Sequence, residues 1–172
     1  PYNKGGGFRK WYGNLNLVVN WQNDGDAIKN NFLRNGKLAS RPQNLKYYFK
    51  RGITWTALTS NSFNARFSKQ GILFDAKGPL LFPNTNNIFY MLGLLNSCIS
   101  IIFLKILAPT LDFNQGPVGR IPFIEDLTKR IQIEKMIQKC IKYAKYDWDS
   151  FETSWDFEQL PILKSDNKLE NL

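Results

Sequence analysis

The chain has 172 residues and a net charge of +9, and 43% of its residues are hydrophobic. This is enough for one domain with a real core and a small appendage, and it excludes a disordered chain. The absence of histidine removes the commonest general base and zinc ligand, which counts against many classes of enzyme. Cys98 and Cys140 have no disulfide or metal-site spacing, so we expect free thiols in a reducing, cytoplasmic compartment.

The charge is distributed unevenly along the chain. Residues 1–70 carry 12 Lys and Arg against 2 Asp and Glu, whereas residues 147–172 carry 2 against 7. A basic body with an acidic tail is typical of a protein that binds a polyanion and docks through a separate face. The alternative is a basic protein whose charges are simply solvated.

Alternating apolar residues predict a strand over residues 15–21. A short helix follows, capped near Asp24 and carrying Phe32 and Leu33 on its apolar side. The three aromatic residues at 47–49 are expected in the core rather than in a ligand site.

The central stretch, residues 50–82, organises the rest of the chain. Two strand-like runs, 50–56 and 71–76, flank a segment of Asn, Ser, Phe and Arg at 60–67. Such side chains donate to base edges, accept from them and stack on them, so this segment is a candidate nucleic-acid contact. A polar hairpin without a ligand is the alternative. Asp75, the one acid in the hairpin, is expected in a structural turn.

The most apolar run, residues 88–107, keeps helical spacing, but polar residues such as Asn96 and Lys105 interrupt it. We therefore expect a buried core helix rather than a membrane span. A loop at 110–121 exposes Phe113 with the two amide residues that follow it, and a second helix begins near Glu125.

The second helix carries an apolar stripe between Ile133 and Ala144, and lysines occupy its remaining positions. We expect these lysines to be solvated, with DNA contact as the alternative. Residues 147–157 alternate acids with large aromatic side chains, so we expect this segment to pack on another domain or back onto this one. Together these patterns predict an α+β fold: a twisted, mostly antiparallel sheet from residues 11–82, followed by two packed helices.

Catalytic constellations are missing from the sequence. There is no Gly-x-Ser-x-Gly motif, a Cys-His pair cannot exist, and the carboxylates of the basic body are scattered. We therefore assign no catalytic, cofactor-binding or metal-binding residue to this chain.

Several stretches resemble the C-terminal, target-recognition part of PglX-type adenine-specific DNA methyltransferases, which belong to BREX phage-defence and type II restriction–modification systems. They are residues 9–14 (RKWYGN), 40–44 (SRPQN), 50–55 (KRGITW), 74–78 (FDAKG) and 148–157 (WDSFETSWDF). The resemblance covers nearly the whole chain, and the tryptophan-rich tail is its most specific part. A helix such as 90–97, followed by a loop and the Ile-Pro segment at 119–122, is also similar to restriction–modification target-recognition domains.

The family's chemistry needs a Gly-rich cofactor motif after a strand and an Asn-Pro-Pro-Tyr-type motif that receives the flipped adenine. This chain has no Pro-Pro dipeptide, and Gly5–Gly7 follow no predicted strand. The resemblance therefore implies a DNA-reading fragment that is not itself catalytic and binds no cofactor, whereas its parent uses S-adenosylmethionine. The implied domains are residues 1–128 for target recognition and 129–172 for a helix and tail that pack on them or on the absent methyltransferase domain.

The implied partners are double-stranded DNA, the N-terminal methyltransferase domain of the parent and other defence-system subunits, with no membrane. We expect lysines and arginines to neutralise phosphates, Arg66 to pair with guanine, and Asn or Gln side chains to pair with adenine. The candidate DNA-binding residues are Arg9, Lys10, Arg41, Gln43, Lys50, Arg51, Thr54, Asn61, Asn64, Arg66, Asn114 and Gln115. A protein-docking module of a phage-defence complex is the alternative function, and an autonomous enzyme such as a nuclease is disfavoured.

Overall fold

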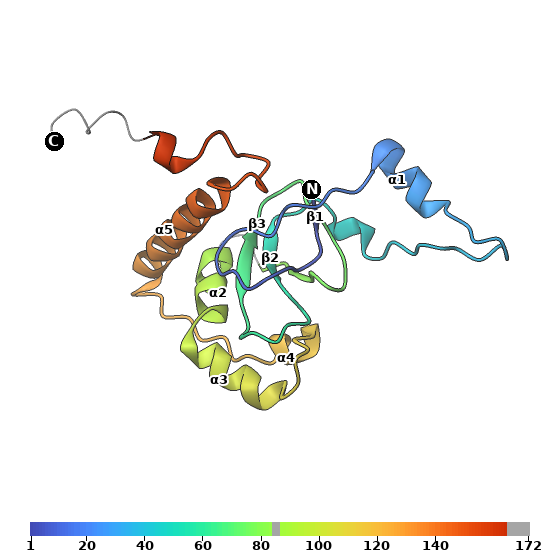
Figure 1. Cartoon of the computed structure of the whole chain (residues 1–172). Coiled ribbons are helices and arrows are strands. Elements are labelled where there is room, and N and C mark those ends of the chain that lie inside the picture. The colour runs from blue at the N-terminus through green and yellow to red at the C-terminus, as the bar shows by residue number, and fades with distance from the viewer. Residues whose placement is uncertain (84–86, 165–172) are drawn as a thin grey trace.

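The computed structural model of the chain describes residues 1–83 and 87–164. It confirms the α+β class, with a small antiparallel sheet at the centre and several helices around it (Figure 1). The strands are β1 (Tyr2–Asn3), β2 (Gly52–Trp55), β3 (Ala65–Ser68), β4 (Leu73–Phe74) and β5 (Leu80–Leu81). The helices are α1 (Gln22–Lys29), α2 (Ile88–Leu95), α3 (Cys98–Leu107), α4 (Gln115–Gly119) and α5 (Arg130–Asp149), with single 3-10 turns at Leu45–Tyr47 and Pro161–Lys164.

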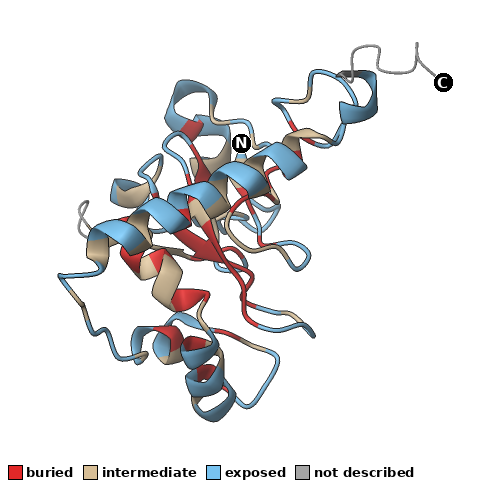
Figure 2. Ribbon diagram, turned by 90° about the vertical axis from the view of Figure 1, so that its left-hand side faces the viewer, coloured by how far each residue is buried: buried red, intermediate tan, exposed pale blue. Residues whose placement is uncertain are grey.

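Strand β2 is the centre of the sheet. It lies between β3 and β5, both antiparallel to it, and Ile53 pairs with Phe67 on one side and Leu81 on the other. Strands β1 and β4 form a separate parallel pair. All four residues of β2 are buried, and Figure 2 shows buried residues gathered in the central strands, with α5 crossing in front of them. The strand is therefore covered on both faces.

Strand β3 begins at Ala65, inside the stretch that we expected to be a polar loop, residues 60–67. That expectation is wrong for the second half of the stretch, because the N-terminal segment runs along β3. The Trp11 amide donates to the Ala65 carbonyl at 2.9 Å, and the Phe67 amide donates to the Trp11 carbonyl at 2.8 Å. The N-terminal segment therefore buries a polar face of β3. From sequence alone, alternating polar and apolar residues predict that such a face is exposed to solvent.

The strand expected over residues 15–21 is not formed. With the described residues it makes one isolated bridge, in which the Tyr2 amide donates to the Leu17 carbonyl at 2.8 Å. The chain then leaves the body, and residues 20–46 project from it as an extended arm (Figure 1). Because α1 ends at Lys29, Phe32 and Leu33 lie beyond the helix and are exposed.

The single helix expected over residues 88–107 is broken into α2 and α3, which bend by 65°. The polar residues at the break have specific partners. The Asn96 side chain accepts from the Ala65 amide at 3.0 Å and donates to the Ala65 carbonyl at 2.9 Å, so it pairs with β3 as a strand would. The Ser97 hydroxyl caps α3 by accepting from the Ser100 amide.

No single helix in the described residues is long and apolar enough to cross a membrane; only the bent pair α2 and α3 together reaches that length and composition.

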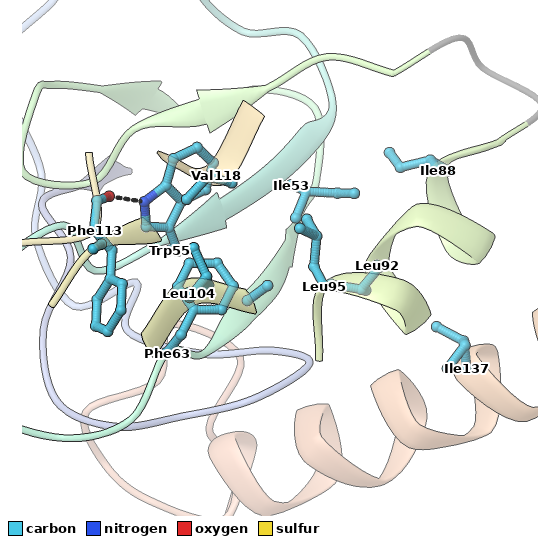
Figure 3. Close-up of a cluster of buried hydrophobic side chains, with 12 residues drawn as sticks. Ile53, Trp55, Phe63, Ile88, Leu92, Leu95, Leu104, Phe113, Val118 and Ile137 are labelled. Atoms are coloured by element: carbon cyan, nitrogen blue, oxygen red, sulfur yellow. Dashed lines mark hydrogen bonds between the residues drawn. The ribbon is translucent and has the colours of Figure 1, made fainter. Parts of the chain in front are cut away.

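The main core lies between the sheet, α2, α3 and α5. In Figure 3, Ile53 of β2 lies toward Leu95 and Leu92 of α2. Trp55 of the same strand lies among Phe113, Val118 and Leu104. The Trp55 indole donates to the Phe113 carbonyl at 2.7 Å (Figure 3). Phe113 is itself buried, contrary to the exposed position expected for it, because its ring packs edge-on against Phe63 at 5.4 Å.

The aromatic tail packs back onto this chain, which is one of the two arrangements expected. Trp148 is buried in a second cluster with Tyr12 and Leu15, and the Trp155 indole donates to the Leu15 carbonyl at 2.6 Å. Gly13, at φ +118°, lies against the Trp148 ring, and a Cβ there would come within 3.0 Å of it. The tail therefore requires glycine at this position.

Candidate nucleic-acid interface

Three of the twelve candidate DNA-binding residues lie inside the protein. Thr54, Asn64 and Arg66 are at most 2% exposed. The Thr54 hydroxyl accepts a short hydrogen bond from the Asn3 side chain, and the side-chain amide oxygen of Asn64 accepts from Arg66 at 2.5 Å. Their side chains cannot reach a base edge in this fold, so the assignment of Arg66 to guanine and Asn64 to adenine is corrected here.

Arg66 has an internal role instead. Its guanidinium donates to the carbonyl of Arg9 at 3.3 Å, the carbonyl of Gly5 at 3.5 Å and the Thr56 hydroxyl at 3.2 Å, besides the bond to Asn64. Burial, and then the charge of Arg9, lower the pKa of Arg66 to about 10. Arg66 thus fixes the N-terminal segment across β3.

Two further candidates are engaged in contacts within the chain. The Arg9 guanidinium forms an ion pair with Asp147 at 2.7 Å and lies 5.0 Å from the centre of the Trp148 ring. The Lys10 ammonium donates to the Asn96 carbonyl at 3.1 Å. These cations hold the tail and the α2–α3 break in place.

The remaining seven candidates lie at the surface. Asn61 and Arg51 are exposed on separate loops, and the exposed Asn114 donates to the Asp112 carboxylate at 2.9 Å. Of the other four, Arg41, Gln43 and Gln115 line one cavity, and the Lys50 ammonium lies near the ring of Tyr47, which lines the same cavity. Sequence positions more than 70 residues apart therefore meet at this site.

The cavity has a volume of about 720 Å³ and lies where the base of the arm meets the body. Arg41, Gln43 and Gln115 line it, together with residues of β1, α1, the 3-10 turn, β4, β5 and the loops that join them. Its aromatic lining residues are Tyr2, Trp21, Tyr47, Tyr48, Phe74 and Phe82.

The aromatic rings pack against one another and thereby fix the wall. Tyr48 meets Trp21 edge-on at 5.2 Å and Phe74 edge-on at 5.4 Å between ring centres. Tyr47 stacks on Phe82 at 4.9 Å with an angle of 22° between the rings. Because each ring limits the rotation of its neighbour, the wall is organised before any ligand arrives.

Positive charge gathers beside this wall. The ammonium groups of Lys46 and Lys50 lie 5.1 Å and 5.4 Å from the centre of the Tyr47 ring. Arg41 is exposed at the cavity itself. An aromatic, partly apolar wall with three cations beside it suits a ligand that combines a flat ring with negative charge.

One acid lies in the cavity wall, and its partners are internal. The Asp75 carboxylate accepts from the Tyr2 hydroxyl at 2.6 Å and from the Lys77 and Gly78 amides at 2.8 and 3.1 Å, as expected for a structural turn. Burial and then the hydrogen bond to Asp75 raise the pKa of Tyr2, while burial raises the pKa of Tyr48. Both phenols are therefore neutral hydrogen-bonding groups at physiological pH.

The aromatic members of this site were missed from the sequence. Tyr47 and Tyr48 were expected in the core, yet both are only half-buried and line the cavity. The available signal was the run Lys46–Lys50, in which two lysines flank three aromatic residues. Trp21, Phe74 and Phe82 carry no such signal, because only the fold brings them to the same place.

No family model matches this chain. Its similarity is to a class of enzymes, the adenine-specific methyltransferases. The chain is 43% identical over 159 residues to the adenine-specific methyltransferase PglX of Lacticaseibacillus casei (strain Zhang), and 33% identical over 167 residues to the adenine-specific methyltransferase BrxX of Escherichia coli O9:H4 (strain HS). These alignments cover 91% and 95% of the chain but only 13% of each relative, so the chain fits a fragment of a PglX-type protein.

Proposed function

We propose that this chain is the target-recognition segment of a PglX-type adenine-specific methyltransferase, and that its α+β fold serves to bind duplex DNA. In this proposal the parent protein works in the cytoplasm and supplies S-adenosylmethionine and the catalytic motifs from its N-terminal methyltransferase domain. This chain presents the DNA to that domain.

The observation that carries the proposal is the group of cations at the cavity. Among the described residues, Arg41, Lys46 and Lys50 form no ion pair with a carboxylate. By contrast, Arg9 and Lys145 of the body are paired with tail acids. Unpaired cations beside exposed amide side chains have the chemistry needed for phosphate contacts next to base-edge contacts.

The test is fluorescence anisotropy with duplex DNA between about 50 and 200 mM salt. We expect the double variant K46A/K50A to bind more weakly and to flatten the dependence of log K on log salt by up to about two units, because each phosphate contact contributes about 0.9. The matched control is K105A/K139A, which removes the same charge from exposed positions on α3 and α5.

If both double variants lose affinity equally, only the net charge matters and the cavity is not the contact surface. If the unaltered chain does not bind duplex DNA at the lowest salt, or binds with no salt dependence, the proposed function is wrong.

A second candidate function, docking within a defence complex, is favoured by a different observation. Helix α3 exposes an apolar stripe of Ile99, Ile102, Phe103 and Ile106, which are spaced as one helix face and are between 37% and 73% exposed. The relatives of this chain are about seven times longer than the region that aligns with it. We therefore propose that another part of the parent protein covers the apolar stripe of α3. Capture of this chain by a PglX-type protein that lacks the segment should be abolished by I102K/I106K and retained by L38K; equal capture by all three forms would contradict it.

A further inference from the structure

We propose that the cavity between the arm and the body binds a single nucleobase, presented by an unpaired nucleotide of DNA, with the adjoining phosphate at the cations on the rim. This inference rests on the proposed function and adds a ligand to it. The base in question is not the adenine that becomes methylated, because the chain contains no Asn-Pro-Pro-Tyr-type motif to receive it.

The size of the cavity fits such a ligand. A volume of about 720 Å³ lies within the range of small-molecule sites, about 300–1,000 Å³. It is also far larger than a gap left by imperfect packing in a protein core, which rarely exceeds a water molecule. A site of this size between two chain segments admits a base together with its sugar.

The wall of the cavity has the chemistry of a base-stacking surface. Trp21, Tyr48 and Phe74 form a chain of edge-to-face contacts, so each ring is held in place by a neighbour. Bases stack on aromatic side chains whatever their sequence, because every base has a π-face. A base paired within a duplex cannot enter such a wall, so the ligand must be unpaired.

A polar group in the cavity is available to the edge of the base. Among the described residues, the Gln43 side-chain amide has no hydrogen-bond partner, and it lines the cavity with one donor and one acceptor to offer. The neighbouring Ser40 hydroxyl is instead occupied by a bond to the Ile28 carbonyl. A glutamine amide matches the adjacent donor and acceptor of adenine, which makes adenine the expected base.

The charged side chains around the cavity also suit a nucleotide. Lys46 and Lys50 lie over the Tyr47 ring, which lines the cavity, and Arg41 is exposed beside it. The acid in the wall, Asp75, is occupied by Tyr2 and two backbone amides, so it leaves the rim positive. A nucleotide therefore fits with its base inward and its phosphate toward the lysines.

The experiment compares the affinity of the 172-residue chain for two duplexes of equal length, one fully paired and one with a single unpaired adenine. A parallel calorimetric titration uses free deoxyadenosine monophosphate. We expect the unpaired adenine to strengthen DNA binding by at least about tenfold, since stacking on aromatic side chains has effects of that order.

Two variants test whether the preference for the unpaired adenine arises at the cavity. Y48A removes a wall ring, and A76W places a large ring at an exposed position that lines the cavity, where it leaves the packed interior unchanged. Both should abolish the preference for the unpaired adenine, so that the two duplexes bind equally. The control Y143A removes an exposed tyrosine from α5, and it should preserve the preference.

Each outcome decides a separate point. If both duplexes bind equally and the mononucleotide does not bind, this inference is wrong. Binding of the paired duplex would still support the proposed function. Binding of the mononucleotide that A76W abolishes, without a preference for the unpaired adenine, reassigns the cavity to a free nucleotide and overturns the DNA source. Absence of all three interactions contradicts both proposals.

Discussion

Arg66 carries its positive charge into the interior, where no carboxylate in the described part of the chain pairs with it. Its fork of donors joins the carbonyls of Gly5 and Arg9 to side chains of the sheet. Lysine keeps the charge but has no planar fork, so it cannot satisfy acceptors on both sides. The residue is therefore expected to act on stability rather than on DNA contact.

We predict that R66K lowers the free energy of unfolding by about 1–3 kcal/mol, because buried acceptors lose their donors. Urea denaturation measures the change, and R34K, at an exposed arginine of the arm, is the matched control. Equal unfolding midpoints for R66K and the unaltered chain would show that the internal bonds of Arg66 contribute nothing.

The tail acids predict a dependence of stability on pH. The hydrogen bond from Lys145 at 2.8 Å, and then the charge of Lys69, hold the pKa of Asp156 below its usual value. Because the folded pKa is the lower one, the contact stabilises the fold above the ordinary carboxyl range, and this stabilisation is lost as the pH falls through the lowered pKa. We expect D156N to lose less stability than the unaltered chain between pH 7 and pH 3, measured by urea midpoints. Parallel losses in the two proteins would contradict this.

At the level of elements, the break between α2 and α3 depends on Asn96. Its side chain bonds both the amide and the carbonyl of Ala65, and that carbonyl also accepts from the Trp11 amide. We predict that N96A destabilises the chain by about 1–3 kcal/mol, because the buried amide of Ala65 loses the bond to Asn96, whereas the carbonyl keeps the bond from the Trp11 amide. Calorimetric unfolding provides the measurement, and N16A, at an exposed asparagine, serves as its control. A loss no greater than that of N16A would mean that water replaces the side chain without cost.

The local sequence pattern predicted those elements in which the apolar residues of the pattern are also the ones that are buried. The strand-like run at 50–56 contains β2, and the apolar stripe from Ile133 to Ala144 is the face of α5 that packs toward the core. Strand β3 could not be predicted, since its polar face is buried only by the N-terminal segment that runs along it. The sequence showed that Asn96 interrupts the apolar run. The structural role of Asn96 could not be predicted, because its partner, Ala65, lies 31 residues earlier in the chain.

The candidate site was predictable only in part for the same reason. Arg41, Gln43, Lys50 and Gln115 were identified by residue type; the fold brings three of them to the lining of one cavity and places Lys50 near its Tyr47 ring. Residue type also selected Thr54, Asn64 and Arg66, whose burial is decided by long-range packing. The aromatic wall required the folded structure, because its members come from distant segments.

At the level of the whole molecule, the uneven charge has a structural consequence within the chain. Acids of the C-terminal segment neutralise cations of the body, as Asp147 does for Arg9 and Asp156 for Lys145. Positive charge at the cavity is left without such a partner among the described residues. Because Trp148 is part of the core, a deletion of residues 147–172 would damage the fold, and the role of the tail is better tested by point substitutions.

The central claim, that DNA lies against the cavity and the arm, is tested most directly by photocrosslinking. A duplex that carries 4-thiothymidine is irradiated with the 172-residue chain, and the linked peptides are identified by mass spectrometry. We predict crosslinks within residues 41–50, and their loss in K46A/K50A. Crosslinks confined to the exposed lysines of α5, between residues 135 and 142, would place the DNA on the opposite element and contradict the account.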